Sequence, residues 1–350
     1  MTVRALDGLR GFAVLLVLLS HMSLHGINLI EQLDFSGVGK AGVYLFFSLS
    51  AFLLTWQALQ LEYSTLKTSR YWLGYAVRRV VRIYPLYVLS LTLSFLLFVS
   101  GENINPRITS FEQIISHLVL LEGEHIYWAI PVEFKYYLIL PLVTFILTIS
   151  FNRHAILPVL IIGAIIAAIT YRWPPGETQN NSFNLMPYLS IFLMGSLGAV
   201  LAPLLKNKQS ALEVLGWASI IIAVFSIPAV WRTVGDPEAT NQVFHRDFLL
   251  YGLIWAITIL AAMSAKRFAI FFELAPWRFL GRISFSIYLW HYFIVQFVAR
   301  DISIHSHLQF VLVVALTLPL SWLSYRYIER PFISWGHRTT NHWQQYPRTT

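Results

Sequence analysis

Long apolar runs alternate with short polar stretches along almost the whole chain. Most of these runs have about the 20 residues that a helix needs to cross a bilayer, and the run at 154–171 is shorter. The pattern predicts an all-α integral membrane protein, a bundle of about ten transmembrane helices. The expected spans are residues 9–29, 38–60, 80–100, 128–149, 154–171, 185–205, 210–230, 246–264, 283–300 and 308–328.

Two of the connecting stretches are themselves rich in apolar residues. Residues 100–127 contain FEQIISHLVLLEG, and residues 268–280 carry several aromatic side chains beside Arg278. We expect both to form interfacial or re-entrant segments. The loops 172–184 and 231–246 instead carry Pro, Gly, Asn and acidic residues, which is typical of exposed turns.

Composition supports the membrane assignment and orients the helices. Hydrophobic residues make up 57% of the chain and charged residues 12%, against roughly 25% charged residues in soluble domains. If the N-terminus is cytoplasmic, alternation places 18 of the 25 Lys and Arg residues on the cytoplasmic side and 7 opposite. Because positive residues collect on that side, both termini are expected in the cytoplasm. The net charge of +8 then reflects topology, and no nucleic-acid partner is expected.

The chain is expected to form one membrane domain over residues 1–335, with a short polar cytoplasmic tail at 336–350. The first apolar run exceeds the length of a signal peptide and lacks a small-residue cleavage site, so it is expected to stay as an anchor helix. The chain has no Cys, which excludes disulfides and thiolate chemistry.

The first apolar run carries ionisable residues that are costly at membrane depth and usually serve function there. Asp7 and Arg10 lie near its start and His21 well inside it. In a helix, Arg10 and His21 would be about 16 Å apart along the axis and roughly 20° apart around it, and so would share a face. A neutral imidazole in apolar surroundings is a natural general base. Taken alone, His21 could equally be a hydrogen-bonded core histidine.

A metal site at this helix is not expected. His25 lies one turn beyond His21 and could complete half a site, but no Cys and no His-Glu motif accompanies the pair. A second intramembrane histidine, His291, lies in the run SIYLWHYFIV.

The block RRVVRIYPLY combines three arginines with a proline at the start of an apolar run. Arg78 and Arg82 share a helix face, and Arg79 lies beside them. Such a cluster suits a polyphosphate, because Arg binds phosphate in bidentate fashion. It is equally consistent with a positive-inside anchor. Pro85 predicts a kink or a broken helix, which membranes tolerate where the backbone lines a cavity.

The stretch WAIPVEFKYY places Glu133 near the external end of a helix, with Tyr137 one turn on. This carboxylate could orient a histidine or bind a sugar hydroxyl, or it could simply pair with Lys135. Ser residues such as Ser50 and Ser284 lie in otherwise apolar helices, where Ser often serves only helix packing.

Together these motifs resemble the membrane acyltransferase 3 family. The matching segments are, in order, LDGLRGFAVLLVLLSH, FFSLSAFLL, RRVVRIYPLY, WAIPVEFKYYLILP, ISFSIYLWH and YRYIERP, and they extend over residues 4–332. The resemblance implies a ten-helix membrane domain that moves acyl groups, usually acetyl, from cytoplasmic acyl-CoA to sugars of cell-envelope glycans. Departures are Ala51 and Ala129, where Gly and Ser are usual, and a missing Pro after His291.

The resemblance also implies roles for individual residues. His21 would be the catalytic histidine, with Arg10 as its motif partner and Glu133 as a further catalytic residue that orients the imidazole or the acceptor. The acyl-CoA would be held by Arg78, Arg79, Arg82 and Tyr87. The substrate cavity would be lined by Asp7, Ser50, Trp128, Tyr137, Ser284 and His291.

The expected function is therefore O-acyl transfer from cytoplasmic acetyl-CoA to a hydroxyl of a glycan or glycolipid, such as O-antigen lipopolysaccharide, in a bacterial inner membrane. Some members of the family carry a C-terminal hydrolase-like domain that completes the transfer. This chain is expected to act as a membrane domain without one, and either acylates its acceptor directly or hands over to a separate protein. The alternative is a transporter or flippase of lipid-linked glycans. An acyl-histidine intermediate and the oligomeric state stay open.

Overall fold

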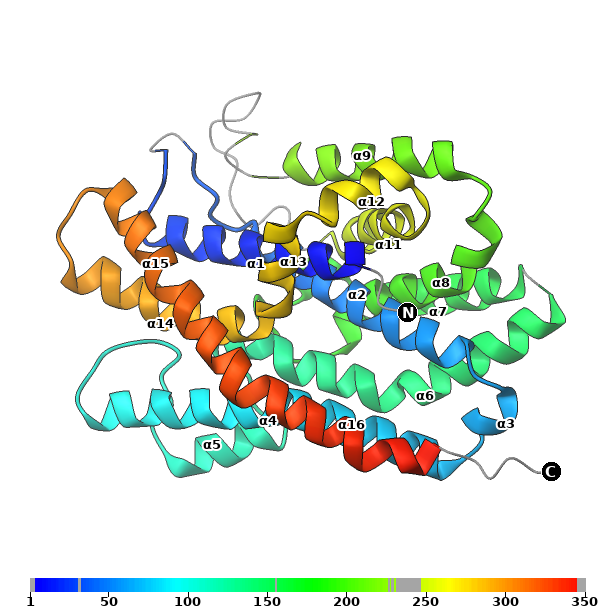
Figure 1. Ribbon diagram of the computed structural model, residues 1–350, viewed down its shortest axis with the longest axis horizontal. Helices are drawn as coiled ribbons and strands as arrows, with labels where there is room; N and C mark the ends of the chain where they lie inside the picture. Colours follow the sequence, from blue (N-terminus) through cyan, green and yellow to red (C-terminus); the bar gives the residue numbers. More distant parts are fainter. Residues whose placement is uncertain are drawn as a thin grey trace.

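The computed structural model describes residues 4–30, 33–154, 156–225, 227, 230 and 247–344, and this part of the chain contains helices and no strand. A helix occupies each of the ten predicted runs, which confirms the all-α fold (Figure 1). These helices are α1 (Arg4–Leu24), α2 (Gly39–Leu59), α4 (Ser69–Val99), α6 (Ala129–Arg153), α7 (Leu157–Arg172), α8 (Leu189–Leu205), α9 (Gln209–Phe225), α11 (Phe248–Ser264), α14 (Ser284–Asp301) and α15 (Ser306–Ser324).

Fewer than ten of these helices are long and apolar enough to cross a membrane alone. Six helical stretches in the described residues meet that condition, and a seventh does if α11 and α12 (Lys266–Phe272), bent by 100°, count as one broken span. The helices α7 and α9 are apolar but have only 16 and 17 residues. Length therefore separates α7 and α9 from the full spans, whereas α14 has 18 residues but is not apolar enough to be among them.

The two apolar connecting stretches contain short helices, as expected for interfacial segments. On one side, α5 (Phe111–Leu118) lies beside α4, followed by a 3₁₀ turn at His125–Trp128. On the other, α12 and α13 (Ala275–Arg282) lie against α1. The short α3 (Tyr63–Leu66) connects α2 to α4.

Glycines allow α1 and the α12–α13 segment to come into backbone contact. A Cβ on Gly8 would lie 1.8 Å from the carbonyl oxygen of Phe272, and one on Gly281 would lie 1.8 Å from the carbonyl oxygen of Asp7. No side chain fits at these distances. The LDGLRG motif thus has a packing role at the end of α1 that carries Asp7.

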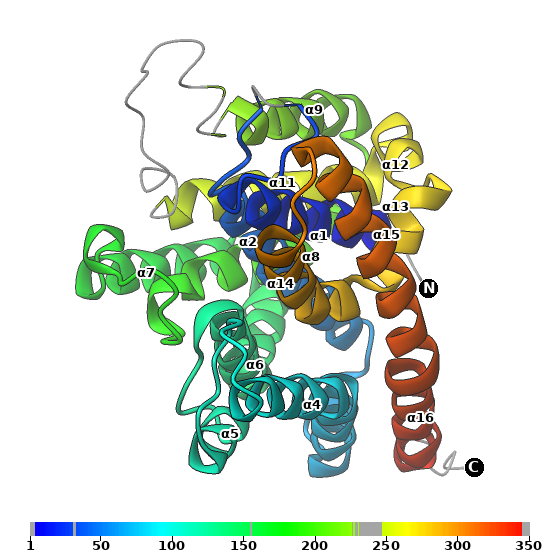
Figure 2. The ribbon, with the colours of Figure 1, turned by 90° about the vertical axis from the view of Figure 1, so that its left-hand side faces the viewer.

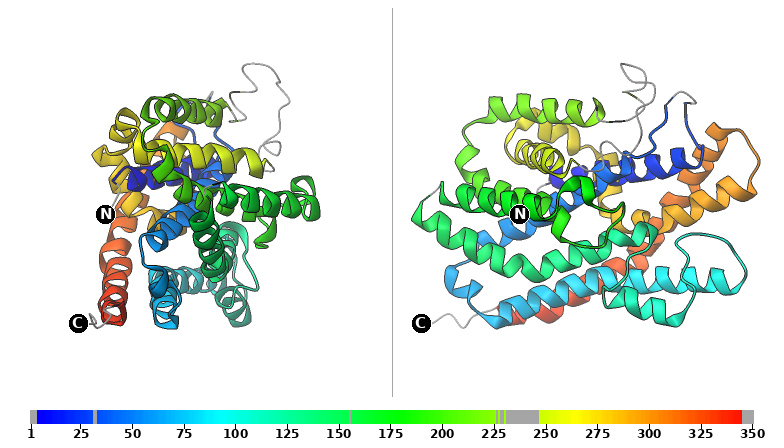
Figure 3. Two further views of the ribbon diagram at one scale, coloured as in Figure 1. Left: turned by 90° about the vertical axis from the view of Figure 1, so that its right-hand side faces the viewer. Right: turned by 180° about the vertical axis from the view of Figure 1, so that it is seen from behind.

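The helices α1 and α2 occupy the middle of the bundle. Viewed along the bundle in Figure 2, they are surrounded by α4, α6, α8, α11, α14 and α15. From behind, α6, α7 and α8 cover the opposite face (Figure 3). Buried aromatic rings join these layers, with Phe47 of α2 stacked on Phe192 of α8 at 4.6 Å between centroids. The centre of the molecule, where a site is best shielded, is therefore lined by α1 and α2.

The last helix differs from the expected polar tail. From α15 the chain continues through a π-helical turn at Tyr325–Glu329 into α16 (Arg330–Gln344), which lies along α4 (Figure 1). Residues 336–344 are thus helical, and 345–350 lie outside the described residues. Helix α16 covers the arginine-bearing part of α4, since Arg78 Nη1 donates to Thr340 Oγ1 at 2.9 Å.

Candidate active site

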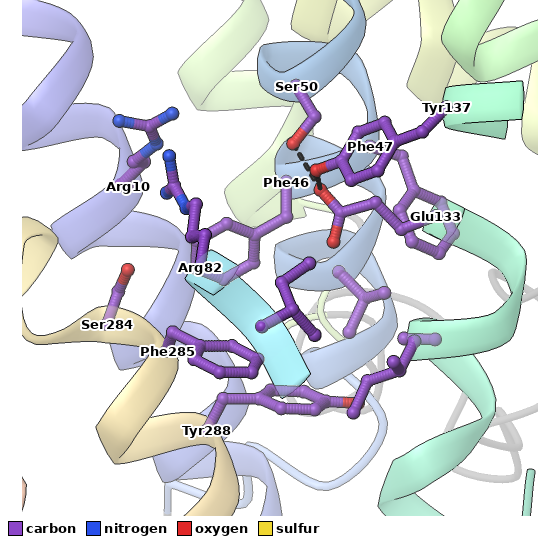
Figure 4. Close-up of a pocket in the computed structure, with 14 residues that line it drawn as sticks. Arg10, Phe46, Phe47, Ser50, Arg82, Glu133, Tyr137, Ser284, Phe285 and Tyr288 are labelled. Carbon is purple, nitrogen blue, oxygen red and sulfur yellow. Dashed lines mark hydrogen bonds between the residues drawn. The ribbon is translucent and has the colours of Figure 1, made fainter. Parts of the chain in front are cut away.

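A cavity of about 630 Å³, which we call the inner cavity, lies between α1, α2, α4, α6 and the start of α14 (Figure 4). Apolar side chains such as Val43, Phe46 and Phe285 form much of its wall. The structure brings together here six residues that the sequence had singled out, namely Arg10, Ser50, Arg82, Glu133, Tyr137 and Ser284.

Within the inner cavity, Glu133 is fixed by two hydroxyl groups. Tyr137 donates to Glu133 Oε1 at 2.5 Å, and Ser50 donates to the same oxygen. Figure 4 shows the guanidinium groups of Arg10 and Arg82 side by side, across the cavity from this carboxylate. The cavity thus carries two cations on one wall and a hydrogen-bonded anion on the other.

A second space, the arginine cleft, adjoins the inner cavity and shares Arg10 and Arg82 with it. It adds Asp7, whose carboxylate lies 3.3 Å from Arg10 Nη1, and Arg79. The Arg79 guanidinium lies 5.8 Å from the ring centre of Tyr137, and its buried Nε has no hydrogen-bond partner in the described part of the chain. Three guanidinium groups with a single carboxylate among them make this cleft suitable for an anion.

The remaining two residues of the predicted donor block lie elsewhere. Arg78 does not line the arginine cleft and donates to α16 instead. Tyr87 is fully buried, with its ring centre 5.4 Å from that of Tyr127. Of the four residues predicted to hold the acyl donor, Arg79 and Arg82 therefore line the arginine cleft, whereas Arg78 contacts α16 and Tyr87 contacts Tyr127. The helix is continuous through Pro85, so the predicted break is absent.

Toward the other end of α1 lies a larger space of about 1120 Å³, which we call the outer cavity. His21 and Trp128, both singled out in the sequence, line it. Its wall also contains polar and aromatic residues that sequence reasoning missed, namely Lys40, His125, Asn180, Asn181 and Tyr292. Val43 lines both the inner and the outer cavity. One face of α1 thus connects an arginine-lined space to a histidine-lined one, in agreement with the shared face predicted for Arg10 and His21.

The two intramembrane histidines are in direct contact. Nδ1 of His21 lies 2.7 Å from Nε2 of His291, and Nδ1 of His291 lies 2.8 Å from the carbonyl oxygen of Ile287. A carbonyl only accepts, so Nδ1 of His291 carries a hydrogen, and its Nε2 is left as an acceptor in the neutral ring. His21 therefore donates from Nδ1, and its Nε2 is the nitrogen with the free lone pair.

This geometry adds a residue pair that the sequence did not indicate. Glu133 was expected to orient either the imidazole of His21 or the acceptor, but the ring that contacts His21 is that of His291. The two histidines are 270 residues apart, and no local spacing predicts that α1 and α14 bring them together. The sequence did contain an indication of Lys40, because it is the one charged residue in the predicted span 38–60.

The described residues contain no group of three or more His, Cys, Asp or Glu side chains able to hold a metal ion. His25 does not join His21 in such a group, and its ring lies edge-on to Tyr292 at 5.7 Å between centroids.

Comparison with known proteins identifies the family of the chain. An acyltransferase domain model, that of the acyltransferase 3 family, matches residues 3–326. The O-acetyltransferase OatA of Staphylococcus aureus strain NCTC 8325 is 26% identical over 362 residues, which cover 95% of this chain and 57% of OatA. OatA of strain COL gives the same values, so the chain spans 57% of the length of these curated relatives.

No solved structure matches the chain. The family model, by contrast, extends from the start of α1 to the π-helical turn after α15, and so includes every residue of the inner cavity, the arginine cleft and the outer cavity. The chain therefore belongs to the acyltransferase 3 family.

Proposed function

We propose that the protein is a membrane O-acyltransferase that moves an acetyl group from acetyl-CoA, bound from the cytoplasm, to a hydroxyl of a cell-envelope glycan such as O-antigen lipopolysaccharide. It would lie in a bacterial cytoplasmic membrane with both termini in the cytoplasm. The observation that carries the proposal is the hydrogen-bond chain from His21 through His291 to the Ile287 carbonyl, which leaves a basic nitrogen on a ring lining the outer cavity. The names of the O-acetyltransferase relatives support the choice of acetyl.

The arginine cleft supports binding of the acyl donor. Its three cations, Arg10, Arg79 and Arg82, outnumber its one carboxylate, that of Asp7. The unpartnered Nε of Arg79 is a buried donor, which is costly to leave unpaired unless a ligand satisfies it. Guanidinium groups bind phosphate oxygens in bidentate fashion, so the phosphates of acetyl-CoA fit here. The thioester would then extend into the inner cavity.

The chemistry assigned to His21 is general acid–base catalysis. Nε2 of His21 takes the proton of the acceptor hydroxyl as the oxygen attacks the thioester carbonyl, and the new C–O bond forms while the C–S bond breaks. The proton then passes from Nε2 to the departing thiolate. Throughout, His291 accepts the Nδ1 hydrogen of His21, which fixes the tautomer and stabilises the imidazolium, as an orienting group does in acyl transfer.

The transporter alternative explains less of the structure. A passage for lipid-linked glycans needs intramembrane polar groups, but it does not need a hydrogen-bonded histidine pair of defined tautomer. It also does not need two spaces of different character, one lined by arginines and the other by a histidine. Transfer of a small acyl group between two separate binding spaces accounts for both features.

The decisive experiment uses the purified protein in lipid nanodiscs with [14C]acetyl-CoA and envelope glycan from a strain that lacks the gene. The wild-type protein should release CoA and label the glycan, and His21→Gln should do neither. His25→Gln is the matched control, because it changes an imidazole one turn along that lies outside the inner and outer cavities. Equal labelling by His21→Gln and wild type would overturn the proposal.

A further inference from the structure

The outer cavity contains a lysine, Lys40, that has no acidic side chain beside it among the described residues. Lys40 is directed into it, and neither Asp nor Glu lines this cavity in the part of the chain that the structure describes. No carboxylate of the described residues lies within ion-pair distance of Lys40 Nζ. The ammonium group instead lies 4.2 Å above the ring centre of Trp128 and donates to Oδ1 of Asn181.

The position of Lys40 on its helix makes this cation more unusual. It is the second residue of α2, which begins at Gly39. The amino end of a helix carries a partial positive charge that favours anions and disfavours cations. The helix dipole therefore disfavours a positive charge on Lys40. An anion beside it would be attracted by both the ammonium group and the helix end. The arrangement favours a negatively charged ligand over an empty or a neutral one.

The rest of the outer cavity is suited to a sugar. Trp128 and Tyr292 contribute aromatic atoms to its wall, and the amides of Asn180 and Asn181 offer donors and acceptors for hydroxyl groups. His21 belongs to the same wall. A sugar that is held here would bring a hydroxyl to the proposed catalytic base while another of its substituents meets Lys40.

We infer that the acceptor is an anionic sugar, with a carboxylate or phosphate group that pairs with Lys40 in the outer cavity. That this ligand is the acceptor rests on the proposed function. That it is negatively charged is inferred from Lys40 and its contacts with Trp128 and Asn181. Uronic acids and sugar phosphates share the required chemistry. A neutral sugar would leave the ammonium group without a counter-charge in a cavity formed by membrane helices.

The test compares three probes of the same size with protein in phosphatidylcholine nanodiscs at low salt. Equilibrium dialysis measures binding of radiolabelled methyl β-D-glucoside, methyl β-D-glucuronide and glucose 1-phosphate. The wild-type protein should bind at least one anionic probe about tenfold more tightly than the neutral one, as a charge-assisted contact provides. The glucuronide and the phosphate distinguish the two possible sources of the charge.

Variants assign the preference to one residue. Lys40→Gln should remove the anion preference and leave binding of the glucoside unchanged, and Lys40→Arg should restore it. Lys135→Gln is the matched control, because Lys135 also lies over an aromatic ring, that of Phe183, but outside the outer cavity. Thermal melting of each variant confirms that it is folded.

The outcomes separate this inference from the proposed function. Equal binding of neutral and anionic probes by the wild type, or a preference that survives in Lys40→Gln, would overturn the inference. An equal loss of all three probes in a folded Lys40→Gln would also overturn it, because the lysine would then act on the sugar ring in general. If the protein transfers acetyl groups but shows no preference for anions, only the inference is contradicted. If it binds anions through Lys40 but transfers no acetyl group, only the proposed function is contradicted.

Discussion

Nδ1 of His21 and Nε2 of His291 lie 2.7 Å apart, so two helices from opposite ends of the chain share one hydrogen bond at the centre of the molecule. The second ring is itself fixed by the carbonyl of Ile287. This relationship gives each nitrogen a defined role, and it makes His291 a positioning residue that can be tested apart from His21.

His291→Phe keeps a ring of similar size but removes the acceptor for the His21 Nδ1 hydrogen. We expect kcat to fall about 100-fold, in the range typical of an impaired general base, with the KM for acetyl-CoA unchanged. His291→Gln retains a carbonyl acceptor and should keep more of the activity than His291→Phe. Initial rates of CoA release at several acetyl-CoA concentrations measure both parameters. A rise in KM with normal kcat would show that His291 contacts the donor instead.

The arginines of α4 should differ in their effect on the acyl donor. Arg79→Gln and Arg82→Gln should each raise the KM for acetyl-CoA about tenfold, because each removes a charge-assisted contact to phosphate. Arg78→Gln is the internal control and should leave KM close to the wild-type value, since this side chain donates to Thr340. An equal rise in all three variants would mean that the whole block acts through its net charge.

Gly8→Ala should destabilise the protein by about 1–3 kcal/mol, the usual cost of overpacking. The added methyl would meet the carbonyl oxygen of Phe272 at 1.8 Å, and helix α1 would have to move away from α12. Gly163→Ala in α7 is the matched control, because nothing lies within 4 Å of its Cβ position. Thermal melting in detergent compares the two variants, and equal melting temperatures would refute this account of the LDGLRG motif.

Glu329 is expected to hold α14 in place from the π-helical turn. It is buried and accepts a hydrogen bond from Ser286 of α14. A second hydrogen bond joins α14 to α15, where Trp290 Nε1 donates to Ser324 at 2.7 Å. Glu329→Ala should lower the melting temperature and kcat together, because the α14 segment carries His291.

Glu329→Gln provides the control for this prediction, since its amide oxygen can still accept from Ser286. It should retain most of the stability and activity of the wild type. If Glu329→Gln is as inactive as Glu329→Ala, the negative charge itself is required and the packing role is insufficient.

Sequence reasoning predicted what depends on local patterns. The ten apolar runs all became helices, and the eleven-residue spacing placed Arg10 and His21 along one face of α1, because the helical period is fixed by the backbone. It indicated that the run at 154–171 is short, but it did not predict that α9, in the run 210–230, has only 17 residues. It also could not separate Arg78 from Arg79 and Arg82, because that depends on where α16 packs against α4.

The pairs that complete the site are long-range contacts. His21 meets His291, and Lys40 meets Trp128 and Asn181, only once α1, α2, α6 and α14 have packed together. Side-chain chemistry identifies His21 and His291 as unusual in a membrane, but chemistry alone does not determine which residues become neighbours. The helix packing decides that, and glycine contacts such as Gly8 with Phe272 are part of it.

Val43 borders both the inner and the outer cavity, and this has a consequence for the membrane if the cavities open to opposite faces, as the proposed function requires. Such cavities shorten the insulating layer between them to a few side chains. Water columns that met there would conduct ions and dissipate the electrical potential of the membrane. An apolar constriction resists wetting and so blocks ions, while a neutral acetyl group is small enough to be handed past it. In the proposed function, the apolar side chains between donor and acceptor would thus also keep the membrane sealed against ion leakage.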